Sequence, residues 1–254
     1  MHGRRSFNLL IIILFFSSTC LATDTIELTI VTEYSPPYQE LSSQGVVTGF
    51  TTEVIKAVLA QTPFHYQINI YPWSRSFMMA KEQPNTCIYS MARNPQREQY
   101  FQWVAPIVTT VDYFIGLSER SDINIQTMAD AKNYNVAVLK DDRTYEMLIN
   151  QGFIKNKNLY VINNTYSMLK LLLIRKDIDL VLADSINIEY RAKYHDIDPS
   201  KFRSYYRLNQ QPINLYLACS LNTPKEIVKK LTSAMQLIMR NGSYQIIHKR
   251  WHKN

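Results

Sequence analysis

Glycine is scarce in this chain. Six glycines stand among 254 residues, and none of them takes the spacing of a Rossmann fingerprint or a P-loop. Both motifs need glycine where the backbone closely approaches a phosphate group, so a nucleotide-driven enzyme of either type is not expected. Dense basic runs are lacking too: Lys and Arg number 28 against 21 for Asp and Glu, and the excess is scattered. Scattered cations seldom form a phosphate-tracking stripe, so we expect no nucleic-acid partner.

Long apolar runs are also missing, except for one near the N-terminus. Residues 9–16 are continuously apolar; Arg4 and Arg5 precede them, and small residues follow up to Ala22. This order is typical of a secretory signal peptide, and the run is short of the roughly 20 residues that span a bilayer. We predict a signal peptide over residues 1–22 and a periplasmic mature protein. Lipidation of Cys20 is the alternative, but the preceding residues lack the usual leading leucine.

Cysteine is limited to three residues, of which Cys87 and Cys219 remain after removal of the signal peptide. Both lie within apolar, strand-like runs. The sequence gives no distance between them, and we expect two buried thiols that behave as small apolar side chains rather than a disulfide.

Strand-like and helix-like segments alternate through the mature chain, which predicts an α/β protein with largely parallel sheets. We expect strands at 26–32, 66–71, 86–90, 113–117, 135–139, 159–162, 180–183 and 213–219, and helices at 52–61, 74–81, 144–151, 165–175, 185–194, 224–239 and 243–251. The pattern restarts after Pro106, and the last segments are too short for a core of their own. We therefore predict lobe 1 from residues 23–110 and 212–254 and lobe 2 from 111–211, joined by two chain crossings that form a hinge.

Two arginines follow the strand at 86–90. Arg93 and Arg97 lie in a polar turn just after Ser90, at the carboxyl edge of a sheet, where open α/β folds bind ligands. Arginine can hold a carboxylate through two parallel hydrogen bonds. The alternative is a surface arginine paired with Glu98.

The mature chain resembles the family-three solute-binding proteins, the periplasmic amino-acid receptors of ABC importers. The resemblance rests on the joint order of motifs that are weak individually: Tyr34-Ser35-Pro36-Pro37-Tyr38, Gly49-Phe50, the segment 88–103, the segment 178–184 and Asn241-Gly242-Ser243-Tyr244. It implies a two-lobed periplasmic-binding-protein fold that closes on its ligand.

The resemblance also implies roles for single residues. Arg97 would bind the α-carboxylate of the ligand with help from Ser90, and Asp184 would bind the α-ammonium group from the second lobe. Without the resemblance, Asp184 is interpreted as the N-cap of the helix at 185–194.

Further candidates line the implied cleft. Tyr34, Tyr38 and Trp73 stand where the family stacks aromatic rings around the ligand, with core packing as the alternative. Arg75 and Arg93 are candidates as well, with solvated surface positions equally open.

The segment Lys140-Asp141-Asp142-Arg143-Thr144 departs from the family pattern. Amino-acid receptors commonly carry a glycine and threonines at this helix start, and these bind the ligand carboxylate. Two acids would repel that carboxylate unless Arg143 replaces the missing donors. The acids could instead favour a cationic ligand side chain or complement the helix N-terminus.

We predict a binding protein and not an enzyme: a monomeric receptor that captures a small zwitterion, expected to be an amino acid, for an ABC permease or a membrane sensor. No cofactor, metal or catalytic residue is expected; His248 and His252 share a helical face without an evident third ligand. The enzyme alternative is a periplasmic cyclohexadienyl or arogenate dehydratase, in which Glu33, Glu40 or Asp142 would carry the proton transfer. A ligand-sensing module is the third possibility.

Overall fold

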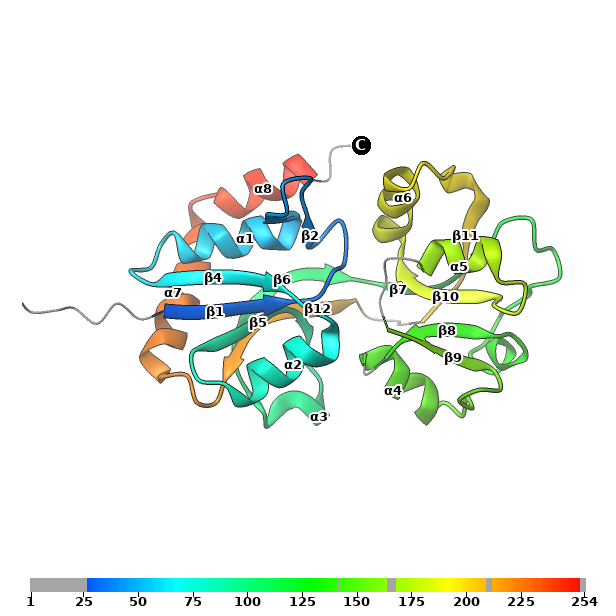
Figure 1. Ribbon diagram of the computed structural model, residues 1–254, viewed down its shortest axis with the longest axis horizontal. Helices are drawn as coiled ribbons and strands as arrows, with labels where there is room; N and C mark the ends of the chain where they lie inside the picture. The colour runs from blue at the N-terminus through cyan, green and yellow to red at the C-terminus, as the bar shows by residue number, and fades with distance from the viewer. Residues whose placement is uncertain (1–26, 141, 164–167, 209–211, 252–254) are drawn as a thin grey trace, which may run out of the picture.

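The computed structural model describes residues 27–140, 142–163, 168–208 and 212–251. The predicted signal peptide and Cys20 lie outside these ranges. Within them the chain folds into two lobes, each built on its own five-stranded sheet (Figure 1). None of the helices in these ranges has the length and apolar content needed to span a bilayer.

The sheet of lobe 1 has the strand order β4-β1-β5-β12-β6. Strand β1 pairs in parallel with β4 and β5, whereas β12 runs antiparallel between β5 and β6. Helices α1, α7 and α8 pack on one face, α2 packs on the other, and α3 follows β5 (Figure 1). The elements of this lobe are β1 (Glu27–Thr32), β2 (Glu40–Leu41), β3 (Val47–Thr48), α1 (Phe50–Leu59), β4 (His65–Ile70), α2 (Trp73–Glu82), β5 (Thr86–Ala92), α3 (Pro95–Glu98), β6 (Phe101–Thr110), β12 (Ile213–Ser220), α7 (Lys225–Arg240) and α8 (Ser243–Trp251).

The sheet of lobe 2 has the order β11-β7-β10-β8-β9. Strand β8 pairs in parallel with β9 and β10, and β7 runs antiparallel to β10 and β11. Helix α4 covers one face, and α5 and α6 cover the other (Figure 1). The elements are β7 (Asp112–Leu117), η1 (Asp130–Asn133), β8 (Val136–Leu139), α4 (Arg143–Asn150), β9 (Leu159–Ile162), α5 (Met168–Ile174), β10 (Leu180–Asp184), α6 (Ser185–Tyr194), η2 (Pro199–Lys201) and β11 (Phe202–Arg207). Parallel pairing thus joins three strands in each sheet. The strands next to the crossings between the lobes, β6 and β12 in lobe 1 and β7 and β11 in lobe 2, pair antiparallel with their neighbours.

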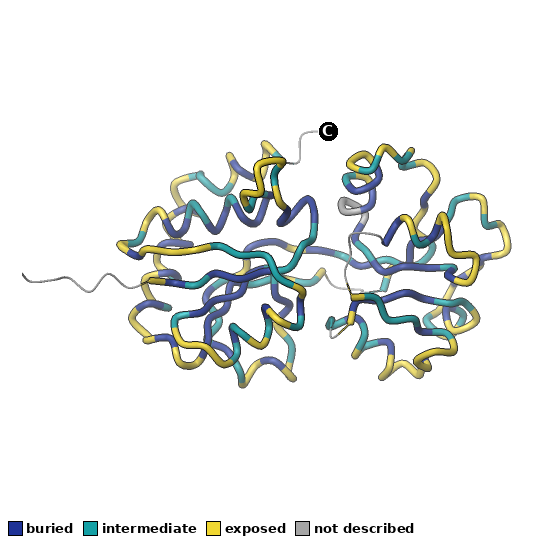
Figure 2. Tube along the Cα trace, in the orientation of Figure 1, coloured by how far each residue is buried: buried dark blue, intermediate teal, exposed yellow. Residues whose placement is uncertain are grey.

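Both faces of each sheet are buried, which explains the continuous apolar runs in the central strands. In β1, Leu28 and Ile30 face the helices α1, α7 and α8, whereas Val31 faces α2. In β10, Leu180 faces α4 and Val181 faces α5 and α6. Because side chains alternate along a strand, a sheet covered on both sides needs apolar residues at successive positions. Figure 2 shows these buried segments running through the middle of each lobe.

The expectation of two free thiols is wrong, because Cys87 and Cys219 form a disulfide. Strand β12 returns to lobe 1 and runs antiparallel beside β5, in a register that sets Cys219 opposite Cys87. Their Cα atoms are 3.9 Å apart although 132 positions separate them in the sequence. The sequence alone could not reveal this pairing, since the whole of lobe 2 lies between the two cysteines.

The first crossing between the lobes is nearly one continuous strand. Strand β6 ends at Thr110, and β7 begins at Asp112 in the other sheet (Figure 1). The chain returns after β11, which ends at Arg207, and enters lobe 1 again in β12. Residues at the first crossing, including Thr110 and Asp112, line the cavity described next.

Candidate ligand-binding site

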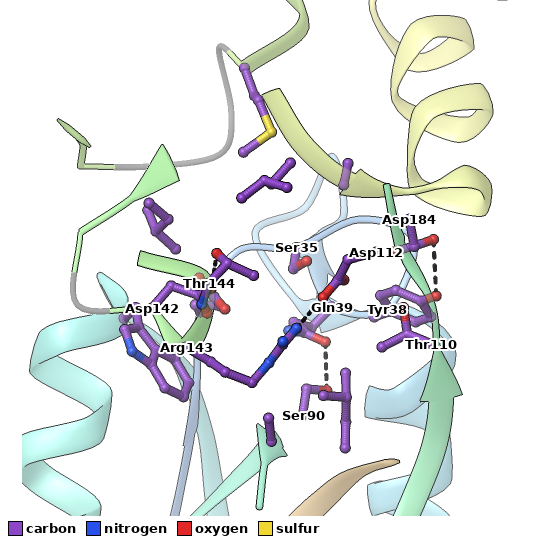
Figure 3. A pocket seen from close by; sticks show the side chains of 18 of the residues that line it. Ser35, Tyr38, Gln39, Ser90, Thr110, Asp112, Asp142, Arg143, Thr144 and Asp184 are labelled. Atoms are coloured by element: carbon purple, nitrogen blue, oxygen red, sulfur yellow. Dashed lines mark hydrogen bonds and ion pairs between the residues drawn. The ribbon is translucent and has the colours of Figure 1, made fainter. Parts of the chain in front are cut away.

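A cavity of about 120 Å³ lies between the lobes. Its walls come from the ends of β5, β8 and β10 and from the loop after β1 (Figure 3). A water molecule needs roughly 10–15 Å³ on the same scale, so this space suits a small molecule and is too small for a folded peptide. The cavity follows the general rule that ligands bind beyond the carboxyl ends of strands in α/β sheets.

Six of the nine residues predicted for the site line this cavity: Tyr38, Trp73, Ser90, Arg97, Arg143 and Asp184. Tyr34, Arg75 and Arg93 are not among the lining residues. Arg93 makes a two-pronged ion pair with Glu98 on the surface, with distances of 2.8 and 2.6 Å. Arg75 is exposed, and its guanidinium stacks 3.9 Å above the ring of Tyr71.

Arg97 is a buried cation with 4% of its surface exposed. Asn94 caps the short helix α3 by accepting a hydrogen bond from the Arg97 backbone amide at 2.9 Å. The guanidinium lies 5.1 Å from the centre of the Trp73 ring, and its Nη1 is 3.5 Å from the carbonyl oxygen of Ala92. It makes no ion pair with any carboxylate in the described part of the chain. Donors therefore remain on Arg97 for an anionic group.

Burial lowers the pKa of Arg97, and the negative charges of Asp142 and Glu146 across the cavity work against that effect. An arginine stays charged in proteins in spite of such a shift. The cost of burying it is recovered only when an anion completes its hydrogen bonds.

Ser90 has a backbone φ of 60°, a left-handed conformation that is uncommon for a residue with a side chain. Its hydroxyl lies 2.9 Å from Gln39 Oε1 and 3.1 Å from the hydroxyl of Thr51. Thr51 in turn donates to the carbonyl oxygen of Tyr38 at 2.8 Å. This network fixes the loop after β1 against the end of β5. Strained backbone of this kind concentrates at binding sites.

Asp184 ends β10 on the opposite wall and is 7% exposed. Tyr38 from lobe 1 donates its phenolic hydrogen to Asp184 Oδ1 at 3.3 Å (Figure 3). Burial first, and then the charge of Asp184, raise the pKa of Tyr38, so the phenol stays protonated and remains a donor. Asp184 is thus a hydrogen-bonded acceptor that faces the cavity.

Arg191 of α6 lines the cavity but was not predicted. It is 5% exposed, and it crosses to lobe 1, where Nε donates to the carbonyl oxygen of Pro36 and Nη2 to the hydroxyl of Ser35, both at 3.2 Å. Burial lowers its pKa, and Asp184 opposes that shift. The sequence around Arg191 contains no motif that indicates a binding residue. An arginine in the last turn of a helix is also explained by its favourable interaction with the helix C-terminus.

The start of α4 is occupied by the chain's own carboxylate. Asp142 caps this helix and accepts hydrogen bonds from the backbone amide of Thr144 at 2.8 Å and from its hydroxyl. Arg143 reaches through the cavity to an ion pair with Asp112 at the hinge (Figure 3). Burial lowers the pKa of Arg143, but the negative charges of Asp112 and Asp142 outweigh this effect, so the pKa is raised. Arg143 is therefore already satisfied, and Asp141 lies outside the described residues.

Glu33 lines the cavity directly after β1. Burial and the nearby charge of Asp142 raise its pKa from 4.5 to about 8, against the opposing effects of Arg191 and Arg97. A carboxyl of this kind is largely protonated at neutral pH. It can donate a hydrogen bond in that state, or become an acceptor when a cation comes close.

The cavity thus combines three arginines with four carboxyl groups: Arg97, Arg143, Arg191, Glu33, Asp112, Asp142 and Asp184. With Arg143 and Asp112 paired to each other, Arg97 can donate hydrogen bonds to an anionic group. The carboxyl groups of Asp184 and Glu33 face the same cavity and can accept hydrogen bonds from a cationic group. Among the described residues, no three His, Cys, Asp or Glu side chains are arranged to hold a metal ion. The arrangement can bind a small molecule that carries both signs of charge.

These features define a two-lobed periplasmic-binding-protein fold with a polar cavity at the lobe interface. The chain belongs to the bacterial extracellular solute-binding proteins, family 3, whose family model matches residues 28–254. A comparison with curated protein sequences finds no match.

Several solved structures share this fold. A histidine kinase sensor domain with similarity to periplasmic binding proteins is 15% identical with a TM-score of 0.80, over 90% of this chain and 96% of that one. The arginine-, lysine-, histidine-binding protein ArtJ from Geobacillus stearothermophilus is 16% identical with a TM-score of 0.76, over 89% and 95%. A periplasmic binding protein of Salmonella typhimurium with high arginine specificity is 15% identical with a TM-score of 0.74, over 90% and 100%. At such identities the likeness concerns the fold alone.

Proposed function

We propose that this protein is a periplasmic receptor that captures a small zwitterionic ligand of the amino-acid class between its lobes and delivers it to an ABC permease. One observation carries the proposal: buried Arg97 from lobe 1 and buried Asp184 from lobe 2 line the same cavity. Membership in the extracellular solute-binding family and the folds of the amino-acid-binding neighbours support it. A membrane sensor that reads the closed lobes remains the alternative partner, and we expect a monomer.

Binding would engage one anchor from each lobe. The carboxylate of an amino acid completes the hydrogen bonds of Arg97, and its ammonium group donates to Asp184 in place of the phenol of Tyr38. Because the two anchors belong to different lobes, the ligand binds the closed form more tightly than the open one. A ligand shifts an existing equilibrium toward closure only through such a difference in affinity.

Calorimetric titration with amino acids tests the proposal. Arg97→Ala should weaken binding at least tenfold, because it leaves the carboxylate of the ligand buried without a counter-charge. Arg93→Ala is the matched control: it removes an arginine four positions away that is paired with Glu98 on the surface, and the affinity should not change. Equal affinities of native protein and Arg97→Ala would contradict the proposal.

A dehydratase of cyclohexadienyl acids is the second candidate, and Glu33 is the observation that favours it. A carboxyl with a pKa of about 8 is protonated at neutral pH and can donate a proton to a leaving hydroxyl. Asp142 also lines the cavity, whereas Glu40 is not among the lining residues and instead accepts a hydrogen bond from Tyr190. Incubation with prephenate or arogenate separates the candidates, since an enzyme consumes them and loses this activity in Glu33→Gln, while a receptor forms no product.

A further inference from the structure

Asp142 occupies a position at which its charge acts on any ligand carboxylate. Its carboxylate caps α4 on the wall of lobe 2 and takes up both the amide and the hydroxyl of Thr144. The amides at a helix N-terminus are a ready site for an anion. Here that site holds an anion of the protein, so it offers little to a second one.

The opposite wall carries the cation that would bind the carboxylate. Arg97 is 4% exposed, lines the same cavity and makes no ion pair with any described carboxylate. Asp142 is the foremost negative charge acting on it, ahead of Glu146. A ligand carboxylate bound to Arg97 therefore enters the field of Asp142, and two like charges in a partly desolvated cavity repel each other.

Arg143, the neighbouring cation, does not cancel this effect. Its guanidinium is committed to Asp112 at the hinge, and the two side chains expose only 16% and 12% of their surfaces.

We propose that Asp142 is a specificity-determining residue that opposes the ligand carboxylate from lobe 2. The inference rests on the proposed function, because it concerns the ligand of that same cavity. In the native chain the carboxylate of an amino acid then contributes little net affinity. A cationic amine of the same skeleton without a carboxylate competes with the amino acid for the cavity.

The test compares Asp142→Asn with the native protein. Asparagine caps helices about as well as aspartate, so the variant keeps the structural role of the side chain and removes its charge. Asp198→Asn is the matched control, because Asp198 caps η2 through the same two bonds, to the amide and the hydroxyl of Ser200, on the exposed surface. Thermal unfolding of the three proteins checks that the fold is intact.

The probes are two pairs that differ by one carboxylate: arginine with agmatine, and lysine with cadaverine. For each pair, calorimetry gives the ratio of the dissociation constant of the amine to that of the amino acid. Asp142→Asn should raise this ratio at least tenfold, because a unit charge acts more strongly on a ligand carboxylate in a partly desolvated cavity than in water. Asp198→Asn should leave it unchanged.

Two results overturn the inference, and they differ in meaning. A ratio that stays constant or falls in Asp142→Asn, while amino acids still bind, shows that the carboxylate is not opposed by Asp142 and leaves the receptor function standing. Folded native and variant proteins that respond to none of the four probes nor to other amino acids overturn the receptor function itself, together with the inference.

Discussion

Glu33 makes the stability of the protein depend on pH. In the folded chain burial and Asp142 raise its pKa to about 8, whereas the unfolded chain holds this carboxyl near its ordinary value of 4.5. Between these values the folded state holds a proton that the unfolded state has lost. Stability from this group is therefore full below about pH 4.5 and falls as the pH rises toward 8, by at most about 1.4 kcal/mol per pH unit.

Urea unfolding of the native protein and of Glu33→Gln, at several values between about pH 5 and pH 8, measures this contribution. Glutamine mimics the protonated carboxyl and does not titrate. The free energy of unfolding should fall more steeply with pH in the native protein than in the variant. Parallel slopes would show that Glu33 titrates alike in the folded and unfolded chains.

Some of the site residues could be predicted from the sequence, and others could not. Asp184 ends a recognisable strand, and Arg97 follows another in the short helix α3. Their placement in the cavity followed from the strand pattern and the family resemblance. Arg93 carries the same chemistry and lies four residues from Arg97, yet it pairs with Glu98 outside the cavity. Arg191 lines the cavity from the last turn of α6. Which side of a turn or helix an arginine takes depends on tertiary packing, which local sequence does not encode.

Helix α6 holds the lobes together by contacts that need no ligand. Tyr190 donates to Glu40 of lobe 1 at 2.7 Å, and Arg191 donates to Ser35 and Pro36. Tyr190→Phe removes a hydrogen bond to a buried acid, a contribution of about 1.5–3 kcal/mol when the acid is charged. We expect this variant to shift the ligand-free protein toward the open form and to bind ligand more weakly.

Small-angle X-ray scattering of the ligand-free protein tests this expectation through the radius of gyration, which should be larger for Tyr190→Phe than for the native chain. Tyr194→Phe is the control, since Tyr194 is on the same helix and 50% exposed. Saturating ligand should bring all three proteins to one value. An equal radius of gyration for the two ligand-free variants would contradict a role of the Tyr190–Glu40 hydrogen bond in holding the lobes together.

Most of the secondary structure was predictable from the sequence. The bounds predicted for α6, α8 and β9 coincide with those observed, and the other expected elements differ by one or two residues at their ends. The expected starts of the first strand at residue 26 and of the helix at residue 165 lie outside the described residues. Strands β6 and β11 were not predicted. Pro106 lies within β6, where a proline argues against a strand. Strand β11 is a short, largely polar and aromatic edge strand without an alternating apolar pattern. Both strands are defined by the neighbour that they pair with, which is distant in sequence.

The disulfide closes a loop that contains the whole of lobe 2. Cys87 and Cys219 lie in neighbouring strands of lobe 1, and 132 positions separate them. A cross-link over so long a segment strongly restricts the unfolded chain, and in the chain-entropy account the gain in stability grows with the logarithm of loop length.

Replacement of both cysteines by alanine should lower the free energy of unfolding by about 2–5 kcal/mol, measured by urea unfolding. The native protein treated with reductant should show a similar loss of stability. In the absence of urea, the affinity of the double variant for ligand should equal that of the native protein, because neither cysteine lines the cavity. If the double variant unfolds at the same urea concentration as the native protein, the disulfide does not contribute to stability. Strand β12 is then held in lobe 1 by its pairing with β5 and β6 alone.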